Sequence, residues 1–215
     1  PINAPSPFEM DNLCKSRLPI INIIDLIATG QEFRMKYMSD IPKIEAYLKS
    51  YIDSFDGLKL HGKLYIQDEK NPTVIMMHGY HSAADFEFAG IYEYFYDRGW
   101  NFILCDQRAH GQSEGEYLTF GVKENKDCYE WVKFIKGRTD GDIYLMGISM
   151  GCSTVLMTLQ NELPENVKGV IADCGFTTPE EIVRKVVGED YSLPDGILMP
   201  FLRFFGKNIG GCDFN

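Results

Sequence analysis

Short apolar runs recur between residues 73 and 172, and mixed segments separate them. Four of these runs have the length and composition of buried strands: Thr73–Met77, Asn101–Cys105, Asp142–Met146 and Val167–Ala172. Strands that are buried on both faces of a parallel sheet show continuous apolar runs of this kind. The pattern therefore predicts a mostly parallel sheet.

The segments between these runs carry apolar residues at helical spacing. In each segment they lie three or four positions apart, which gives a helix one apolar side. These sides consist of Phe88, Ile91, Tyr92 and Phe95, then Cys128, Trp131, Val132 and Ile135, then Val155, Leu156 and Leu159. Strands that alternate with such helices predict an α/β fold with helices on both faces of the sheet.

A hairpin is predicted before the first buried run. Tyr51–Phe55 and Leu58–Ile66 have strand character, and Asp56-Gly57 between them is typical of a tight hairpin turn. We therefore expect an antiparallel pair at the start of the sheet.

Residues 1–48 carry no catalytic motif. Leu18–Ile27 and Gln31–Lys49 both predict helices, and the first is too short to span a membrane. Helices packed on the core are the expected arrangement, and an interfacial or lid helix is the alternative. This gives an N-terminal extension over 1–48, a core over 49–178 and a cap over 179–215.

The predicted cap begins with a clear helix start. Thr178 is a good N-cap, Pro179 suits the first helical position, and Glu181 completes a capping box. Pro194–Phe205 is apolar and aromatic. Two interpretations of that segment remain open, a lid that lines an acyl pocket or a helix packed on the domain.

Composition limits the possible partners. The chain has 215 residues, of which 45% are hydrophobic, so it suits one domain with a sizeable core. The net charge of −10 and the lack of a Lys/Arg cluster argue against nucleic acid as a partner. The six cysteines include no C-x-x-C pair, so we expect reduced thiols and a cytoplasmic location, with cell-surface association as the alternative. Membrane contact is not expected.

The sequence Gly147-Ile148-Ser149-Met150-Gly151 lies between a predicted strand and a predicted helix. Strand, G-x-S-x-G and helix in this order are typical of a nucleophile elbow, a sharp turn that presents a reactive serine. The alternative is a Gly/Ser turn in an ordinary βα unit.

Two other strands end in matching motifs. Thr73–Met77 leads into His78-Gly79-Tyr80, and Asn101–Cys105 leads into the sequence DQRAHGQS over 106–113. With the elbow, these motifs resemble the α/β-hydrolase superfamily. The resemblance is to its serine-hydrolase branch, which includes monoacylglycerol lipase-like and serine aminopeptidase-like proteins and bacterial proteins described as cell-surface hydrolases. It covers roughly residues 50–178.

The resemblance implies specific roles for three residues. Ser149 is the expected nucleophile, and the backbone N–H groups of Tyr80 and Met150 are the expected oxyanion hole, at a point about 3 Å from each. Substrate-binding side chains are not identifiable from the sequence.

A serine nucleophile needs a base, and in this fold the histidine follows the serine and the acid in the chain. All four histidines, at 61, 78, 81 and 110, precede Ser149. His81 is a weak candidate for the base, and Asp173 is a minor candidate for the acid. No metal-ligand spacing and no dinucleotide motif is present, so neither a metal nor a cofactor is expected.

Three functional hypotheses follow. The leading one is a carboxylesterase- or lipase-like serine hydrolase that cleaves a small acyl ester. The others are a catalytically silent α/β-hydrolase domain that binds a ligand or partner, and a peptidase or acyltransferase of the same fold.

The resemblance also implies further strands beside Val167–Ala172. Without them this strand would be an exposed apolar sheet edge, which natural proteins usually cover. We therefore expect a C-terminal segment or another chain to cover that edge and to supply the acid and the histidine. The chain alone is expected to be inactive.

Overall fold

A six-stranded sheet organises the part of the chain that the computed structural model describes, which is residues 47–176, 178–182, 184, 200 and 203. In the sheet the strands lie in the order β1-β2-β4-β3-β5-β6. Their bounds are β1 Leu48–Asp53, β2 Lys59–Tyr65, β3 Thr73–Met77, β4 Asn101–Cys105, β5 Ile143–Ile148 and β6 Val167–Asp173.

The strand pairing confirms a mostly parallel sheet. Strands β4, β3, β5 and β6 run parallel to one another. The predicted hairpin is present as the antiparallel pair β1 and β2, and β2 pairs antiparallel with β4. The antiparallel part therefore forms one side of the sheet.

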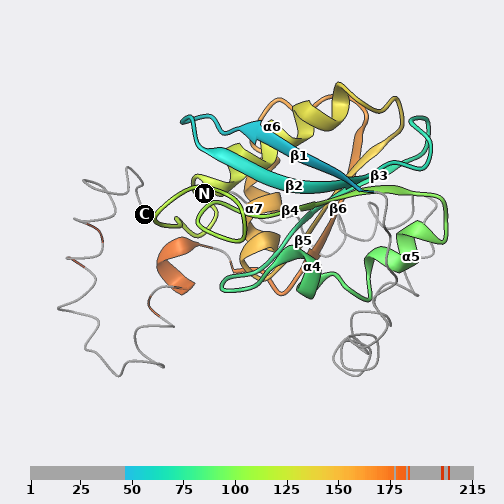
Figure 1. Cartoon of the computed structure of the whole chain (residues 1–215). Coiled ribbons are helices and arrows are strands. Elements are labelled where there is room, and N and C mark those ends of the chain that lie inside the picture. The colour runs from blue at the N-terminus through green and yellow to red at the C-terminus, as the bar shows by residue number, and fades with distance from the viewer. Residues whose placement is uncertain (1–46, 177, 183, 185–199, 201–202, 204–215) are drawn as a thin grey trace.

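Helices cover both faces of the sheet (Figure 1). Helices α4 (Ala84–Glu87) and α5 (Tyr92–Tyr96) lie on one face, and α6 (Glu124–Lys136) lies on the other with α7 (Met150–Thr158). No helix among the described residues is long and apolar enough to cross a membrane.

Successive side chains of β3 pack into two separate hydrophobic cores, one on each face of the sheet. Val74 and Met76 pack with α4 and α5, whereas Ile75 and Met77 pack with α6. All four side chains are fully buried. Because neighbouring side chains of a strand point to opposite faces, the continuous apolar run in the sequence reflects a strand buried on both sides.

Three expected elements differ in detail. Lys49 belongs to β1 and not to a helix, because Leu48 and Lys49 continue the antiparallel ladder with Leu64 and Lys63. The helix expected around Phe88–Phe95 is two short helices, and Gly90, a poor helix former, lies in the turn between them. Its expected apolar side is nevertheless buried.

Helix α7 also differs from its expected pattern. It ends at Thr158, and Leu159 is 45% exposed while Val155 is fully buried. Most of α7 is enclosed, including its polar Ser153 and Thr154.

The expected N-cap at Thr178 is present, since the Glu181 N–H donates to Thr178 Oγ1 at 3.2 Å. The expected helices at Leu18–Ile27 and over most of Gln31–Lys49, and the Pro194–Phe205 segment apart from positions 200 and 203, lie outside the described residues.

A buried arginine links three elements. Arg108, which is 2% exposed, donates from Nε to Asp127 Oδ2 of α6 at 2.6 Å. It also donates to both carboxylate oxygens of Asp56 in the β1–β2 turn, at 3.0 and 3.1 Å. The loop after β4 is therefore tied both to the hairpin and to α6.

Candidate active site

The carboxyl ends of the parallel strands bring the three sequence motifs to one edge of the sheet. His78-Gly79-Tyr80 follows β3, the segment from Asp106 follows β4, and Ser149 follows β5. The chain leaves β3 toward one face and β5 toward the other, so these two neighbouring strands form a switch point. Ligands of open α/β sheets bind at such points.

Ser149 occupies a strained turn at the N-terminus of α7. Its φ and ψ are 52° and −115°, a conformation that side-chain-bearing residues rarely adopt. Its side chain makes no capping hydrogen bond to α7, and its own N–H donates to the Asp173 carbonyl at 2.9 Å. The hydroxyl is thus presented at the positive end of the helix.

Both glycines of the elbow are needed for close packing. A β-carbon on Gly147 would lie 2.1 Å from the Gly151 carbonyl oxygen. One on Gly151 would lie 1.8 Å from the Met77 carbonyl oxygen. Because these distances are far below van der Waals contact, both positions of the elbow require glycine, which has no β-carbon.

The backbone N–H groups of Tyr80 and Met150 flank this turn. Neither donates a hydrogen bond to another of the described residues. The Gly79 carbonyl, on the peptide that carries the Tyr80 N–H, is bonded to His78 Nδ1 at 2.7 Å. In a trans peptide the N–H points opposite to the carbonyl, so this bond fixes the direction of the Tyr80 N–H.

A buried hydrogen-bond chain connects His78 to the elbow helix. The Gln107 N–H donates to His78 Nε2 at 3.1 Å, so the neutral ring donates from Nδ1. Burial lowers the pKa of His78 to about 4, which keeps the ring neutral. Thr154 Oγ1 of α7 donates to Gln107 Oε1 at 3.1 Å. The loop after β3 is thereby coupled to α7.

Glu87, the last residue of α4, holds the other side of the same loop. Its Oε2 accepts the Gly79 N–H at 2.5 Å. A β-carbon built on Gly79 would lie 3.3 Å from both Glu87 Oε1 and Ser149 Cβ. The carboxylate and the serine therefore both lie close to Gly79. No cation of the described residues forms an ion pair with Glu87.

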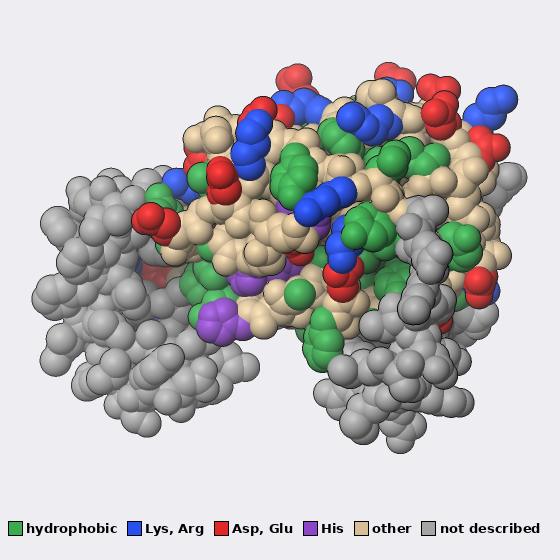
Figure 2. Space-filling model, viewed as in Figure 1, with side chains coloured by type: hydrophobic (Ala, Val, Ile, Leu, Met, Phe, Trp, Pro, Cys, Tyr) green, Lys and Arg blue, Asp and Glu red, His purple; other side chains and the backbone are tan. Residues whose placement is uncertain are grey.

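None of the four histidines forms a hydrogen bond with Ser149. His61 is buried and bonds to Asp106 Oδ2 at 2.8 Å, and His78 braces the loop. His110 Nε2 accepts the His81 N–H at 3.2 Å, and His81 stacks on Tyr80 with ring centroids 3.9 Å apart. Figure 2 shows histidine side chains gathered on one part of the surface, with hydrophobic side chains beside them.

Asp173 ends β6 beside the elbow, where its carbonyl accepts the Ser149 N–H. Its carboxylate forms no hydrogen bond or ion pair with any of the four histidines. Cys174 follows with φ of 47° and is exposed, and partial burial of the sulfur raises the pKa of its thiol. Within the described residues no three side chains are grouped to hold a metal ion.

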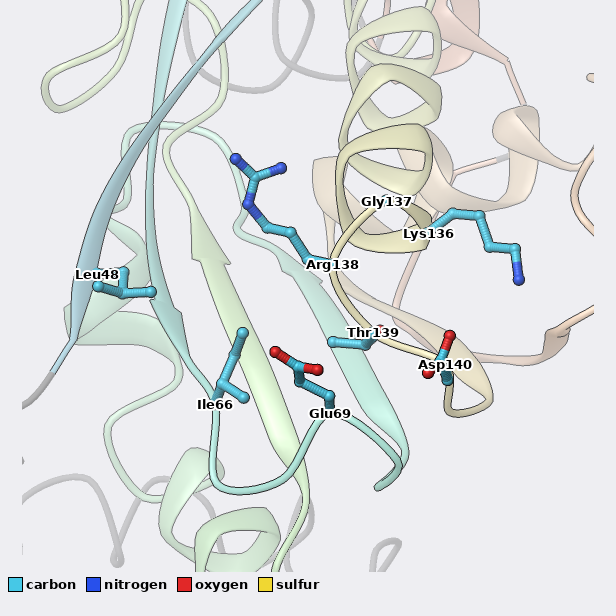
Figure 3. A pocket seen from close by; sticks show the side chains of 8 residues that line it. All are labelled: Leu48, Ile66, Glu69, Lys136, Gly137, Arg138, Thr139 and Asp140. Carbon is cyan, nitrogen blue, oxygen red and sulfur yellow. The ribbon is translucent and has the colours of Figure 1, made fainter.

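A cavity of about 450 Å³ lies at the opposite edge of the sheet (Figure 3). Its lining combines the start of β1, the loop after β2 and the segment that follows α6, including Leu48, Glu69, Arg138 and Asp140. None of the motif residues lines it, so the chemistry expected at Ser149 does not involve this cavity.

Residues 72–209 match the family model described as the alpha/beta hydrolase fold, which is more than half of the chain. The chain belongs to the α/β-hydrolase family. An esterase of this fold, Pf2001 from Pyrococcus furiosus, is similar in structure with a TM-score of 0.58. It is 28% identical, and the alignment covers 77% of this chain and 62% of that one.

Two curated proteins are also similar in sequence. The uncharacterized protein YqkD of Bacillus subtilis is 35% identical over 54% of this chain and 39% of its own length. The thiohydrolase AneE of Aspergillus aculeatus is 30% identical over 62% of this chain and 44% of its own length. This α/β-hydrolase chain thus matches less than half the length of these two relatives.

Sequence reasoning did not identify Glu87, Gln107 or Thr154 as neighbours of the elbow. Each is an ordinary polar residue in a helix or loop, and no local pattern marks it. Gln107 lies inside the recognised motif after β4, and its position directly after a strand-end aspartate was the one available signal.

Proposed function

We propose that Ser149 is the nucleophile of a serine esterase that acts on a small acyl ester. The observation that carries this proposal is the strained conformation of Ser149 at the N-terminus of α7, with its hydroxyl free of the helix. Residues with a side chain and a strained backbone conformation cluster at active sites, where the strain positions a reactive group. The esterase relative supports the same class of reaction.

In the proposed reaction, Ser149 Oγ attacks the carbonyl carbon of the ester. The Tyr80 and Met150 N–H groups donate to the negative oxygen of the tetrahedral intermediate. The alcohol then leaves with a proton, and water later releases the acid from the acyl-enzyme. Bonds of His78 and Glu87 to the Gly79 peptides hold the first donor in place.

The proton of Ser149 has to pass to a base, and none of the four histidines is hydrogen-bonded to this serine. We propose that a C-terminal segment or another chain supplies the histidine and its carboxylate. This assignment makes the described domain the part that carries the nucleophile and the oxyanion donors.

Labelling by a fluorophosphonate tests the proposal, because this probe reacts with activated serines. The full-length native protein should be labelled at Ser149, and Ser149→Ala should abolish the label. Ser50→Ala is the control, since Ser50 lies on β1, on the far side of the sheet from β5, and its hydroxyl donates to the Leu48 carbonyl. Labelling that persists in Ser149→Ala, or that is absent from the native protein, would contradict it.

A silent binding domain is the second candidate, and it is favoured because no histidine is hydrogen-bonded to Ser149. Because one relative is a thiohydrolase, thioesters are also candidate substrates. A peptidase, which cleaves amides, and an acyltransferase are the remaining alternatives of the same fold. Rates of the native protein on matched esters, thioesters, amides and acyl acceptors distinguish these reactions. A silent domain would turn over none of them.

A further inference from the structure

Three aromatic side chains form an arc beside the elbow. Tyr80 and Phe120 have ring centroids 5.8 Å apart, and Phe120 and Phe176 have centroids 6.3 Å apart. They come from the loops after β3, β4 and β6. None of the three belongs to the two cores of the sheet, and Tyr80 is 44% exposed.

Hydrogen bonds and packing against α7 hold the loop that carries Phe120 in place. The N–H groups of its two neighbours, Thr119 and Gly121, both donate to the buried Glu124 carboxylate at 2.8 Å. Phe120 has φ of 51°, which is unusual for a bulky residue. A β-carbon on Gly121 would lie 2.8 Å from Met157 Sδ, so the loop is pressed against α7. The ring is thus held in place at a conformational cost.

Phe176 is fixed to the first turn of α7. Its N–H donates to Ser153 Oγ at 2.9 Å, and Ser153 Oγ donates to its carbonyl at 2.8 Å. Tyr80 follows Gly79, whose built β-carbon would lie 3.3 Å from Ser149 Cβ. The arc therefore starts and ends next to the helix turn that carries the nucleophile.

We infer that this arc is the acyl-binding subsite and that it selects esters of aromatic carboxylic acids. Flat rings stack on or meet the edges of aromatic side chains, and this geometry favours an aromatic ligand over an alkyl chain of similar size. In the proposed reaction the base is supplied by a C-terminal segment or another chain, so the leaving group must face that partner, and the arc is assigned to the acyl group. The inference rests on the proposed function of Ser149.

Binding to the inactive Ser149→Ala variant of the full chain tests the inference without turnover. Methyl cinnamate is the aromatic probe, and methyl nonanoate, which has equally many acyl carbons, is the aliphatic probe. We expect tighter binding of methyl cinnamate by titration calorimetry or ligand-observed NMR. Adding Phe120→Leu or Phe176→Leu should weaken cinnamate binding roughly three- to tenfold and change nonanoate binding less than about twofold.

Tyr96→Leu is the matched control, because Tyr96 is a similarly exposed aromatic on α5, remote from the strand ends that carry the motifs. Phe120→Tyr, which keeps the ring, should retain the preference, and melting curves identify any variant that fails to fold. Equal affinity for both probes, no binding of either, or equal weakening by Tyr96→Leu would overturn the inference. If the Ser149→Ala variant still prefers methyl cinnamate but the native protein is not labelled at Ser149, the aromatic subsite is supported and only the esterase proposal is refuted.

Discussion

Gly147 and Gly151 show how single atoms determine the shape of the nucleophile turn. Each hydrogen on these residues faces a backbone carbonyl that a methyl group would overlap. The sequence motif predicted both glycines for the sharpness of the turn. The structure adds that Gly151 also allows α7 to approach β3 closely, because its contact is with Met77.

We predict that Gly151→Ala destabilises the protein by at least about 3 kcal/mol, since the new β-carbon overlaps backbone that cannot rotate away. Gly57→Ala is the control. It places a β-carbon at φ of 89° with no atom within 4 Å, so only the backbone cost of about 1 kcal/mol applies. Urea unfolding midpoints measure both changes. Equal losses for the two variants would contradict the packing argument.

At the scale of elements, the Arg108 network joins the hairpin, the loop after β4 and α6. Burial opposes ionisation of Asp56, but the hydrogen bonds from Arg108 and Ser54 prevail and lower its pKa from 3.8 to about 2. A carboxyl whose pKa is lower in the folded state stabilises the fold above its unfolded pKa. That contribution is complete above about pH 4 and is lost as the pH falls toward 2.

Asp56→Asn should therefore reduce the free energy of unfolding at pH 7 by on the order of 1 kcal/mol, after allowance for solvent screening. The difference from the unchanged protein should shrink between pH 4 and pH 2. Urea unfolding at a series of pH values measures this. A difference that stays constant down to pH 2 would show that the charge of Asp56 does not contribute.

Helix α4 contributes to the site through one carboxylate. We predict that Glu87→Ala slows fluorophosphonate labelling of Ser149 in the native protein about tenfold, because the Gly79 N–H loses a charged acceptor. Glu87→Gln keeps an acceptor and should slow it less. Asp85→Ala is the control on the same helix, since Asp85 pairs with Lys63. Equal slowing by Asp85→Ala would mean that α4 acts only through its general stability.

The elements themselves were largely predictable from the sequence. β3 and β4 have the predicted bounds, because their apolar runs reflect burial on both faces. The break between α4 and α5 was not predictable from apolar spacing, which continues through Gly90. The Thr154–Gln107 bond joins residues 47 positions apart, so no local pattern encodes it. The Glu87–Gly79 bond spans only eight residues, but it depends on how the loop after β3 turns back on α4, which apolar spacing does not show.

At the scale of the whole molecule, the two sides of the sheet differ. β6 pairs with β5, and no other described strand lies beside it. Its apolar residues Val167, Val170 and Ile171 are only half-buried, whereas β3 is fully buried. A parallel strand with half-exposed apolar residues favours a further neighbour.

We predict that the outer amides of β6 exchange hydrogen at least about ten times more slowly in the full-length native protein than in the 215-residue chain. The added protection would come from a C-terminal segment or another chain that pairs with β6. Amides of β3, which has neighbours on both sides, should change little. Equal exchange of β6 in both forms would argue against a covering segment.

The exposed thiol of Cys174, beside the elbow, is a site at which a dye can be attached covalently. Cys105, Cys128 and Cys152 are buried, which leaves Cys174 as the accessible cysteine of the described residues. With Cys14 and Cys212 replaced by serine, an environment-sensitive dye coupled to Cys174 would report directly on ligands that arrive at Ser149. Because its thiol pKa is raised, coupling calls for alkaline buffer, and reaction of the dye with the buried thiols would be slower still.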